Sequence, residues 1–309
     1  MTISILKALT RSFRIGRAMH PTLNASSLKH QTLLLTQVLT HLPAIRKWFD
    51  ISDNPSLTLA LQRFPLISGA MYWPYLNHTW PLDQKLATID QHYRMLTGRA
   101  AIIAEATLNE VELAKIEEYT GLRLVLDKTE WFLREGEIVL NLFVNDQRFY
   151  SIAFTLGVEA CQPVIFVGAL QGSNSDTAQD VYRNMTHALY GMRPRDFIMV
   201  AFKLLCRELE IFRILAVSSD KRQHNSPYFG EAHKDRVIVA YDQVWLVHRG
   251  VAQTNGFYDI PAMVKHKDVE DVATRKRAAY KRRYQMLDKL AMDIKNSVAQ
   301  HASPPCRAP

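Results

Sequence analysis

The segment EIVLNLFVNDQRFYSIAFTL (residues 137–156) is the clearest indication of the fold. It contains two β-rich runs joined by Asn145 and Asp146. Val, Ile, Phe and Tyr are enriched in strands, and Asn and Asp tolerate the backbone of a two-residue hairpin turn. The neighbouring runs LRLVLDK (122–128) and PVIFVGAL (163–170) have the same character. The sequence therefore predicts an antiparallel meander over about 122–170.

Helices and further strands are predicted after the meander. Gly191 suits the first position beyond a helix, and Pro194 suits a helix start. The predicted helices cover about 176–190, 194–209 and 268–298, and the predicted strands cover 213–219 and one or two segments within 236–250.

The residues before the meander have a helical pattern. Apolar side chains recur at helical spacing over about 26–49 and 80–96, and prolines divide 50–75 into short helices and turns. The predicted fold class is α+β, with an N-terminal helical region packed on a mostly antiparallel sheet that helices flank. The expected divisions are an N-terminal helical region (1–120), an α+β core with a C-terminal basic helix (121–298) and a disordered tail (299–309).

The composition is that of an ordinary globular protein. Of the 309 residues, 48% are hydrophobic and 22% are charged, which excludes wholesale disorder, collagen and low-complexity proteins. Three cysteines are too few and too scattered for a disulfide framework, so we expect reduced thiols and a cytoplasmic protein. The formal charge of +8 favours phosphates, nucleic acid or anionic lipid as partners.

The first predicted helix has two interpretations. Residues 1–21 form a helix with one apolar stripe, made by Ile5, Leu6, Leu9, Phe13 and Met19, and with arginines on its flanks. Such a helix lies at a membrane interface or docks its stripe on the protein's own core. No stretch reaches the ~18 apolar residues of a membrane span, so we expect no transmembrane segment. Peripheral association with the inner membrane stays open.

Several common catalytic motifs do not occur in the sequence. The chain has no GxxxxGK[ST] loop, no GxGxxG after a strand, no GxSxG elbow and no HExxH pair. Kinases, ordinary dehydrogenases, α/β-hydrolases and zincins are therefore disfavoured. Since no histidine pair has helical spacing together with a third ligand, no metal is expected.

Two glutamates at the mouth of a predicted strand are candidate catalytic residues. The spacing in Arg134-Glu135-Gly136-Glu137 places Glu135 and Glu137 on the same face of a strand. A carboxylate there acts as a general base or pairs with a cation. A solvated hairpin face is the alternative.

The run VGALQGSNSD (167–176) is a candidate phosphate site, because it links a strand to a helix start with free backbone N–H groups. The candidate ligand-binding residues are Gln171, Gly172, Ser173 and Asp176, together with Arg193 before the next helix. An ordinary turn capped by Ser175 or Asp176, with arginines on the surface, is the alternative.

Six of the nine residues 275–283 are basic. Their local positive potential suits RNA, DNA or an anionic membrane. The candidate contacts are Lys276, Arg277, Lys281, Arg282 and Arg283. Since Asp268, Glu270 and Asp271 lie just upstream, a solvated helix with internal salt bridges is the alternative.

The blocks REGE (134–137), LQG (170–172), GMRP (191–194) and KRAAYKRRY (276–284) occur in an order, over about 75–290, that resembles the VirK/YbjX family of Gram-negative bacteria. The resemblance implies an association with virulence, envelope stress and resistance to cationic antimicrobial peptides. It implies no assigned molecular activity and no catalytic residue.

The order of predicted elements also looks like the core of a GNAT-type acyltransferase. In that order, antiparallel strands lead to a strand that ends at 168–172, and a helix and a returning strand follow. That likeness implies acyl-CoA as a cofactor, with its pyrophosphate on the loop after the strand. The chain departs from the GNAT pattern, since the Q/RxxGxG/A loop is reduced to residues 171–174 and a second helix intervenes.

Two functions follow as hypotheses. In the first, the protein binds an anionic membrane surface or nucleic acid through its N-terminal helix and residues 276–283. In the second, it is an acyltransferase acting on an envelope component or a peptide. Glu135 or Glu137 is then the general base, and the 171–176 loop and Arg193 hold the phosphates of acyl-CoA.

Overall fold

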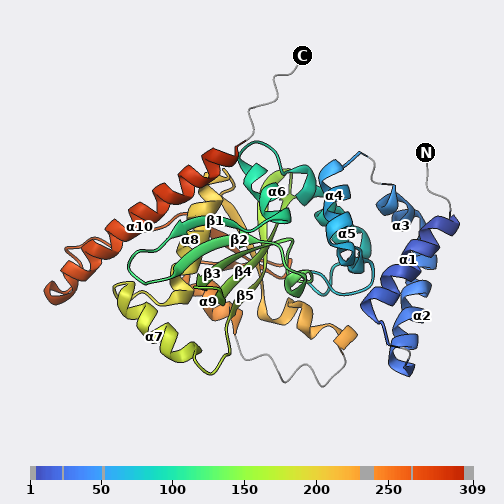
Figure 1. Cartoon of the computed structure of the whole chain (residues 1–309), viewed down its shortest axis with the longest axis horizontal. Coiled ribbons are helices and arrows are strands. Elements are labelled where there is room, and N and C mark those ends of the chain that lie inside the picture. Colours follow the sequence, from blue (N-terminus) through green and yellow to red (C-terminus); the bar gives the residue numbers. More distant parts are fainter. Residues whose placement is uncertain (1–4, 23, 51–52, 230–239, 266, 303–309) are drawn as a thin grey trace, which may run out of the picture.

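A computed structural model describes residues 5–22, 24–50, 53–229, 240–265 and 267–302. Within these residues, one eight-stranded, mostly antiparallel sheet runs in the order β1-β2-β3-β4-β5-β6-β8-β7 (Figure 1). The strands are β1 (Val111–Lys115), β2 (Leu122–Asp127), β3 (Ile138–Val144), β4 (Gln147–Glu159), β5 (Gln162–Gly172), β6 (Arg213–Val217), β7 (Val251–Ala252) and β8 (Phe257–Pro261). The mixed helix-and-sheet class and the predicted meander are confirmed.

The helices before the sheet extend from it to one end of the molecule, where α1, α2 and α3 lie (Figure 1). They are α1 (Ile5–Met19), α2 (Ala25–Thr40), α3 (Leu42–Phe49), α4 (Pro55–Arg63), α5 (Leu82–Arg94) and α6 (Ala101–Leu108), with a 3-10 helix over Pro65–Met71. One hydrophobic core joins them to the sheet, because buried side chains from Leu34 to Val298 belong to a single cluster. Strand β1 lies inside the segment that the sequence assigned to helices, and it pairs with β2.

Among the strands of the described residues, only β5 and β6 pair in parallel, with Ile165–Val167 aligned to Ile214–Ala216. A parallel pair needs a long crossover connection. Here the crossover consists of α7 (Ala178–Ala188) and α8 (Pro194–Glu208). Both helices lie where the sequence predicts them, within one or two residues at each end.

Helix α8 and the N-terminal helices cover opposite faces of the sheet. The ring of Phe154 packs on Phe202 of α8, with 5.1 Å between ring centroids. The next residue, Thr155, meets Tyr75 on the other side, with their hydroxyls 2.8 Å apart. Successive strand residues face opposite sides of a sheet, so this pair of contacts places the sheet between the two helical layers.

The prediction of strands within 236–250 is wrong for the residues that the structure describes. Tyr241–Val247 forms helix α9, and 230–239 lie outside the described residues. Tyr241, Val244 and Trp245 are buried at the i, i+3, i+4 spacing of a helix face. The Trp245 indole donates a 2.8 Å hydrogen bond to the Val217 carbonyl. Packing on β6 therefore overrides the strand propensity of these β-branched and aromatic residues.

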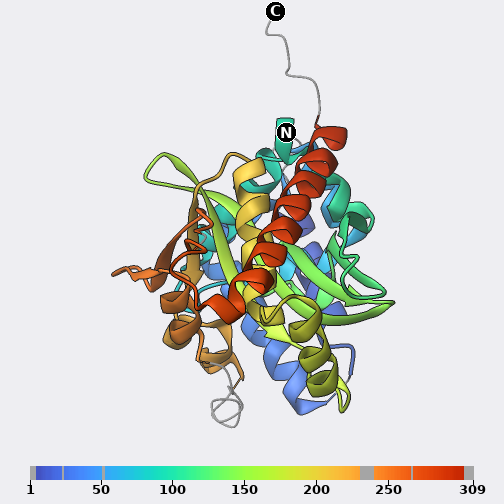
Figure 2. The same cartoon turned by 90° about the vertical axis from the view of Figure 1, so that its left-hand side faces the viewer.

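The last helix, α10 (Thr274–His301), begins six residues later than predicted and packs along α8 (Figure 2). Its buried residues, from Met286 to Val298, all lie beyond its first twelve residues. The basic first half therefore projects past the body of the protein. Residues 299–301, predicted as part of the tail, continue this helix, and 303–309 lie outside the described residues.

A buried ion pair ties the N-terminal helices to the sheet. Lys128 Nζ donates to Glu137 Oε2 at 2.8 Å, and both side chains are 1% exposed. The hydroxyls of Tyr75 and Tyr93 donate to the same carboxylate at 3.1 and 2.8 Å. Burial alone would raise the pKa of Glu137, but the charge of Lys128 holds it below its ordinary value. Burial lowers the pKa of Lys128, and the charge of Glu137 opposes that shift, so each partner supplies the counter-charge of the other.

Replacing only Lys128 should therefore destabilise the protein strongly. We expect Lys128→Met to cost about 3–5 kcal/mol, because it leaves a buried carboxylate without its counter-charge. The double variant Lys128→Met/Glu137→Leu should recover most of that loss. Urea unfolding monitored by circular dichroism measures both, and a single variant as stable as the wild type would contradict this role.

Candidate anion-binding site

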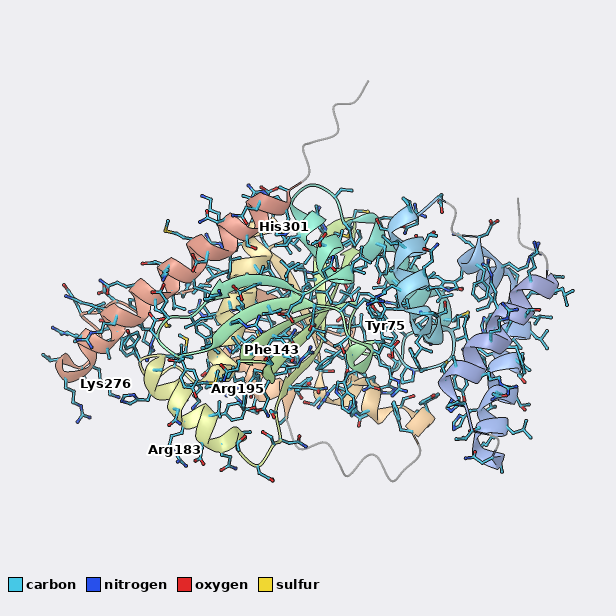
Figure 3. The ribbon with its side chains drawn as sticks, viewed as in Figure 1. Tyr75, Phe143, Arg183, Arg195, Lys276 and His301 are labelled. Carbon is cyan, nitrogen blue, oxygen red and sulfur yellow. The ribbon has the colours of Figure 1, made fainter. Side chains whose placement is uncertain are left out.

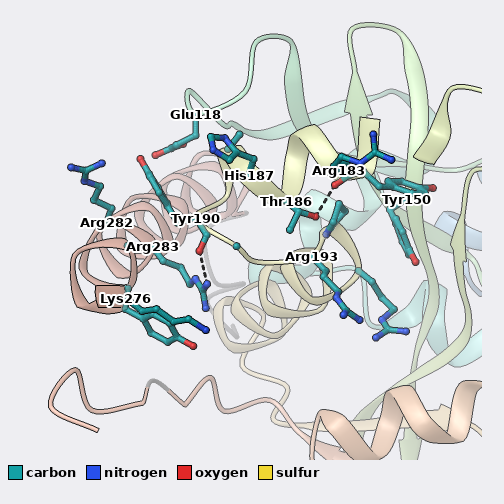
Figure 4. Close-up of a pocket in the computed structure, with 17 residues that line it drawn as sticks. Glu118, Tyr150, Arg183, Thr186, His187, Tyr190, Arg193, Lys276, Arg282 and Arg283 are labelled. Atoms are coloured by element: carbon teal, nitrogen blue, oxygen red, sulfur yellow. Dashed lines mark hydrogen bonds between the residues drawn. The ribbon is translucent and has the colours of Figure 1, made fainter. Parts of the chain in front are cut away.

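A cleft with a volume of about 1240 Å³ opens between α7, the first turn of α8 and the first half of α10 (Figure 4). Six basic side chains line it, with Glu118 as the acidic residue among the lining residues: Arg183, Arg193, Arg195, Lys276, Arg282 and Arg283. Four tyrosines complete the wall: Tyr150, Tyr182, Tyr190 and Tyr280. The cleft is therefore cationic and partly aromatic.

One wall of the cleft comes from the turn between α7 and α8. Gly191 adopts φ +79°, a left-handed conformation that favours glycine, and the chain then enters α8 at Pro194. Arg193 is the N-cap residue of α8, and its side chain makes no capping hydrogen bond. The positive end of a 15-residue helix and an exposed guanidinium thus lie together at the cleft.

The opposite wall comes from α10, which Figure 4 shows facing the α7–α8 turn. The Arg283 guanidinium donates to the Tyr190 carbonyl and lies 4.3 Å from the centre of the Tyr280 ring. These contacts join α10 to the turn after α7. Lys276 and Arg282 are exposed on the same helix and line the same cleft.

The positive charge in the cleft is only partly compensated. Arg183 pairs with Asp180 at 3.0 Å, and Arg195 Nε lies 3.6 Å from Asp196 Oδ1. The Nε atoms of Arg195 and Arg283 are buried, and neither has a hydrogen-bond acceptor among the described residues. Arg193, Lys276, Arg282 and Arg283 form no ion pair with another described residue, so an anion with several oxygens suits this cleft.

The structure brings together four residues that the sequence assigned to two separate sites. Arg193 was a candidate for the phosphates of a cofactor, whereas Lys276, Arg282 and Arg283 were candidates for a membrane or nucleic acid. All four line the cleft. Two other candidates do not line it: Lys281 is exposed elsewhere on α10, and Arg277 donates to the carbonyls of Val272 and Glu270.

The predicted phosphate loop lies outside the cleft lining. The Gln171 amide donates to Glu135 at 3.0 Å, and Gly172 pairs with Tyr150 in the sheet. The Ser173 hydroxyl bonds within the loop, while Asp176 is exposed. The loop touches the cleft only indirectly, since its Ser173 carbonyl accepts from the Tyr182 hydroxyl at 3.1 Å.

Glu135 and Glu137 are both buried just before β3, at 4% and 1% exposure, so neither belongs to a solvated hairpin face. Their surroundings differ. Glu137 is the partner of Lys128, whereas Glu135 Oε1 accepts from the amides of Gln171 and Gln223 at 3.0 and 3.1 Å. Only Glu135 lacks a direct cationic partner at hydrogen-bond distance among the described contacts.

Burial raises the pKa of Glu135 from 4.5 to about 7, although the two amide donors and the nearby charges of Arg222 and Arg134 oppose the rise. A carboxyl group with a pKa near neutrality is suited to proton transfer. Arg222 lies 3.7 Å from the centre of the Tyr241 ring, and the Tyr241 hydroxyl accepts from the Leu170 N–H. Glu135 is thus a candidate catalytic group beside the carboxyl end of β5.

Sequence reasoning missed several residues of these two sites. Arg183, His187 and Tyr190 were not singled out, although their spacing of four and three residues puts them on one face of the predicted helix. Gln223 and Tyr241 carried no motif, since they join Glu135 only through the tertiary fold. Among the described residues, no group of three or more His, Cys, Asp or Glu side chains is arranged to hold a metal ion.

The raised pKa of Glu135 predicts a pH-dependent stability. Because its folded-state pKa of about 7 lies above the ordinary 4.5, the protonated side chain stabilises the fold fully below about pH 4.5. That contribution is lost as the pH rises through 7. The stability of the wild type relative to Glu135→Gln should therefore fall by up to about 3 kcal/mol between pH 4.5 and 8. Urea unfolding of both proteins measures it, and a constant difference would show that burial does not shift this group.

Comparisons with known proteins place the chain in a family. A family model described as "Protein of unknown function (DUF535)" matches residues 24–296. The chain is 29% identical over 298 residues to the uncharacterized protein YbjX of Escherichia coli, covering 93% of this chain and 87% of that protein. It is 27% identical over 226 residues to an uncharacterized protein of Haemophilus influenzae, covering 71% and 73%. No solved structure matches.

None of the described helices is long and apolar enough to span a membrane. The matched residues 24–296 include both walls of the cleft and the buried glutamates. The chain therefore belongs to the DUF535 family, also called the VirK/YbjX family.

Proposed function

We propose that this protein binds a small phosphate-bearing ligand in the cleft between α7, α8 and α10. The observation that carries the proposal is the convergence of Arg193 from the start of α8 with Lys276, Arg282 and Arg283 from α10 on one concave surface. Guanidinium groups and a helix N-terminus are the groups that proteins use to hold phosphate oxygens.

The shape of the site favours a compact ligand with more than one phosphate. Cationic side chains lie on two facing walls, so a ligand with more than one phosphate can contact both walls at once. The four tyrosines that line the cleft offer aromatic faces and hydroxyls to the part of the ligand that carries no phosphate. A nucleotide-like molecule with a di- or triphosphate group has both features, and coenzyme A is one such molecule.

Removing cations on both walls should weaken binding. We expect coenzyme A and inorganic tripolyphosphate to bind the wild type, and the double variant Arg193→Gln/Arg282→Gln to lose at least about tenfold in affinity, since a hydrogen bond to a charged group is worth about 1.5–3 kcal/mol. Both side chains are exposed, so folding should not change. Isothermal titration calorimetry at low salt measures the affinities.

A matched control removes the same amount of charge from α10 outside the cleft. Arg275→Gln/Lys281→Gln changes two exposed residues of α10 that are not among the cleft-lining residues, and it should bind both ligands as the wild type does. Equal losses in the two double variants would point to a diffuse effect of net charge and would contradict a site in the cleft.

Acyl transfer is a second candidate function, and the shape of the sheet favours it. Strand β5 pairs with β6 only as far as Val167 and then continues to Gly172 with β4 as its partner. On the side that β6 leaves, the Tyr241 hydroxyl accepts from the Leu170 N–H. The sheet therefore opens at the carboxyl end of β5, beside the first turn of α8. This opening is the observation that supports acyl-CoA as a ligand of the cleft.

In this proposal, Glu135 is the general base. It takes the proton from an acceptor amine or hydroxyl, whose nucleophilic atom bonds the acyl carbon while the carbon–sulfur bond breaks. The thiolate of coenzyme A leaves and takes up a proton. A base with a pKa of about 7 carries out this transfer near neutral pH.

Thiol release from acetyl-CoA, followed with a chromogenic disulfide reagent in the presence of candidate amine acceptors, tests this function. We expect Glu135→Gln to bind coenzyme A with unchanged affinity while releasing at least about 100-fold less thiol, as is typical when a general base is removed. Equal thiol release by the wild type and Glu135→Gln would exclude Glu135 as the base.

The role in envelope stress and antimicrobial-peptide resistance that the family resemblance implies is part of the same proposal. An enzyme that transfers an acyl group to an envelope component would alter the surface that cationic peptides meet. The acceptor would then be an amine or hydroxyl of that component, because these are the groups that a neutral-pH base activates.

A further inference from the structure

Charge is distributed very unevenly along this chain. Of its 38 basic and 30 acidic residues, residues 1–49 contain seven basic residues and no acidic one, so that the rest has 31 basic and 30 acidic residues. The seven are Lys7, Arg11, Arg14, Arg17, Lys29, Arg46 and Lys47. The segment that forms α1, α2 and α3 therefore carries nearly all of the net charge of +8.

Helix α1 packs against α2 through its small side chains. Its buried residues are Ala8, Ser12 and Gly16, which lie four residues apart on one face. A Cβ atom at Gly16 would come within 2.7 Å of the Leu34 side chain, so the two helices approach closely there. Because small residues occupy the packed face, Leu6 stays 74% exposed and Phe13 44% exposed.

Helix α2 also leaves large apolar side chains in solvent. Leu28 and Leu39 are 67% and 59% exposed, and they lie eleven residues apart, which places them on the same side of the helix. Of the two interpretations of the first helix, docking of the whole apolar stripe on the core therefore does not occur. Leu9 and Met19 are partly buried against the core, while Leu6 and Phe13 are uncovered.

We propose that α1, α2 and α3 form a docking surface for an anionic phospholipid bilayer. Lys and Arg side chains are attracted to the negative surface potential of such a bilayer, and exposed Leu and Phe side chains enter the boundary between headgroups and acyl chains. A nucleic acid would account for the cations but gives no reason for uncovered leucines. The combination of both kinds of residue favours the bilayer.

This surface is distant from the cleft. Figure 1 shows α1, α2 and α3 at one end of the molecule, and Figure 3 shows Arg183 and Lys276 toward the other. A protein docked through α1–α3 thus keeps the cleft open to solution. The proposed docking surface does not depend on the proposed phosphate site, and separate variants test the surface and the site.

Sedimentation with vesicles tests the apolar contribution. The full-length wild type should sediment with phosphatidylcholine vesicles that contain about 30% phosphatidylserine and stay in the supernatant with pure phosphatidylcholine at about 0.1 M salt. Leu6→Ser/Phe13→Ser should lose most of this binding. Leu246→Ser/Val247→Ser, which changes two residues of α9 that are 52% and 67% exposed, is the matched control and should bind as the wild type does.

The electrostatic contribution has its own variant. Each Lys or Arg near an anionic surface is worth about 1 kcal/mol, which is about fivefold in affinity. Arg14→Gln/Arg17→Gln/Lys29→Gln should therefore bind vesicles about 100-fold more weakly, and about 0.5 M salt should weaken wild-type binding. All three residues are exposed, so circular dichroism should show an unchanged fold.

Three outcomes would overturn this inference. In the first, the wild type does not sediment with the anionic vesicles, whether or not it binds a single-stranded RNA oligonucleotide. Another is unchanged vesicle binding by Leu6→Ser/Phe13→Ser. The third is loss of vesicle binding by Arg193→Gln/Arg282→Gln with retention by the α1–α2 variants, which would place lipid headgroups in the cleft and leave the proposed phosphate site standing.

Discussion

The parallel pairing of β5 with β6 is the constraint on which the candidate site depends. Antiparallel neighbours are joined by short turns, but a parallel neighbour requires the chain to travel back along the sheet before it pairs. That return is α8, so its first turn must lie at the carboxyl end of β5. Helix α10 packs along α8 with its apolar second half, and its basic first half therefore overhangs the same end. The cleft therefore results from the packing of α8 on the sheet and of α10 on α8.

Two buried glutamates separated by one residue show how surroundings decide the chemistry of a carboxyl group. Glu137 accepts from Lys128, Tyr75 and Tyr93, and this set of donors keeps it ionised and structural. Glu135 accepts from two neutral amides, and burial raises its pKa to about 7. The first group holds the N-terminal helices on the sheet. The second has a pKa raised to about 7, which suits proton transfer near neutral pH.

Local patterns predict the meander, the α7 and α8 helices and the long basic helix, because alternation, Gly191 and Pro194 are local signals. They fail at Tyr241–Val247, where β-branched and aromatic residues form a helix because Tyr241, Val244 and Trp245 pack on one side. The cleft was not predictable as one site, since Arg193 and Arg283 meet only through tertiary packing. The burial of Glu135 likewise depends on Gln223, far away in the sequence.

A crystal structure of the full chain with tripolyphosphate or coenzyme A is the most direct test of whether the cleft between α7, α8 and α10 holds phosphate groups. We expect phosphate oxygens within hydrogen-bond distance of Arg193 on one wall and of Arg282 or Arg283 on the other. Phosphates bound elsewhere, or a cleft without ligand at saturating concentration, would contradict it.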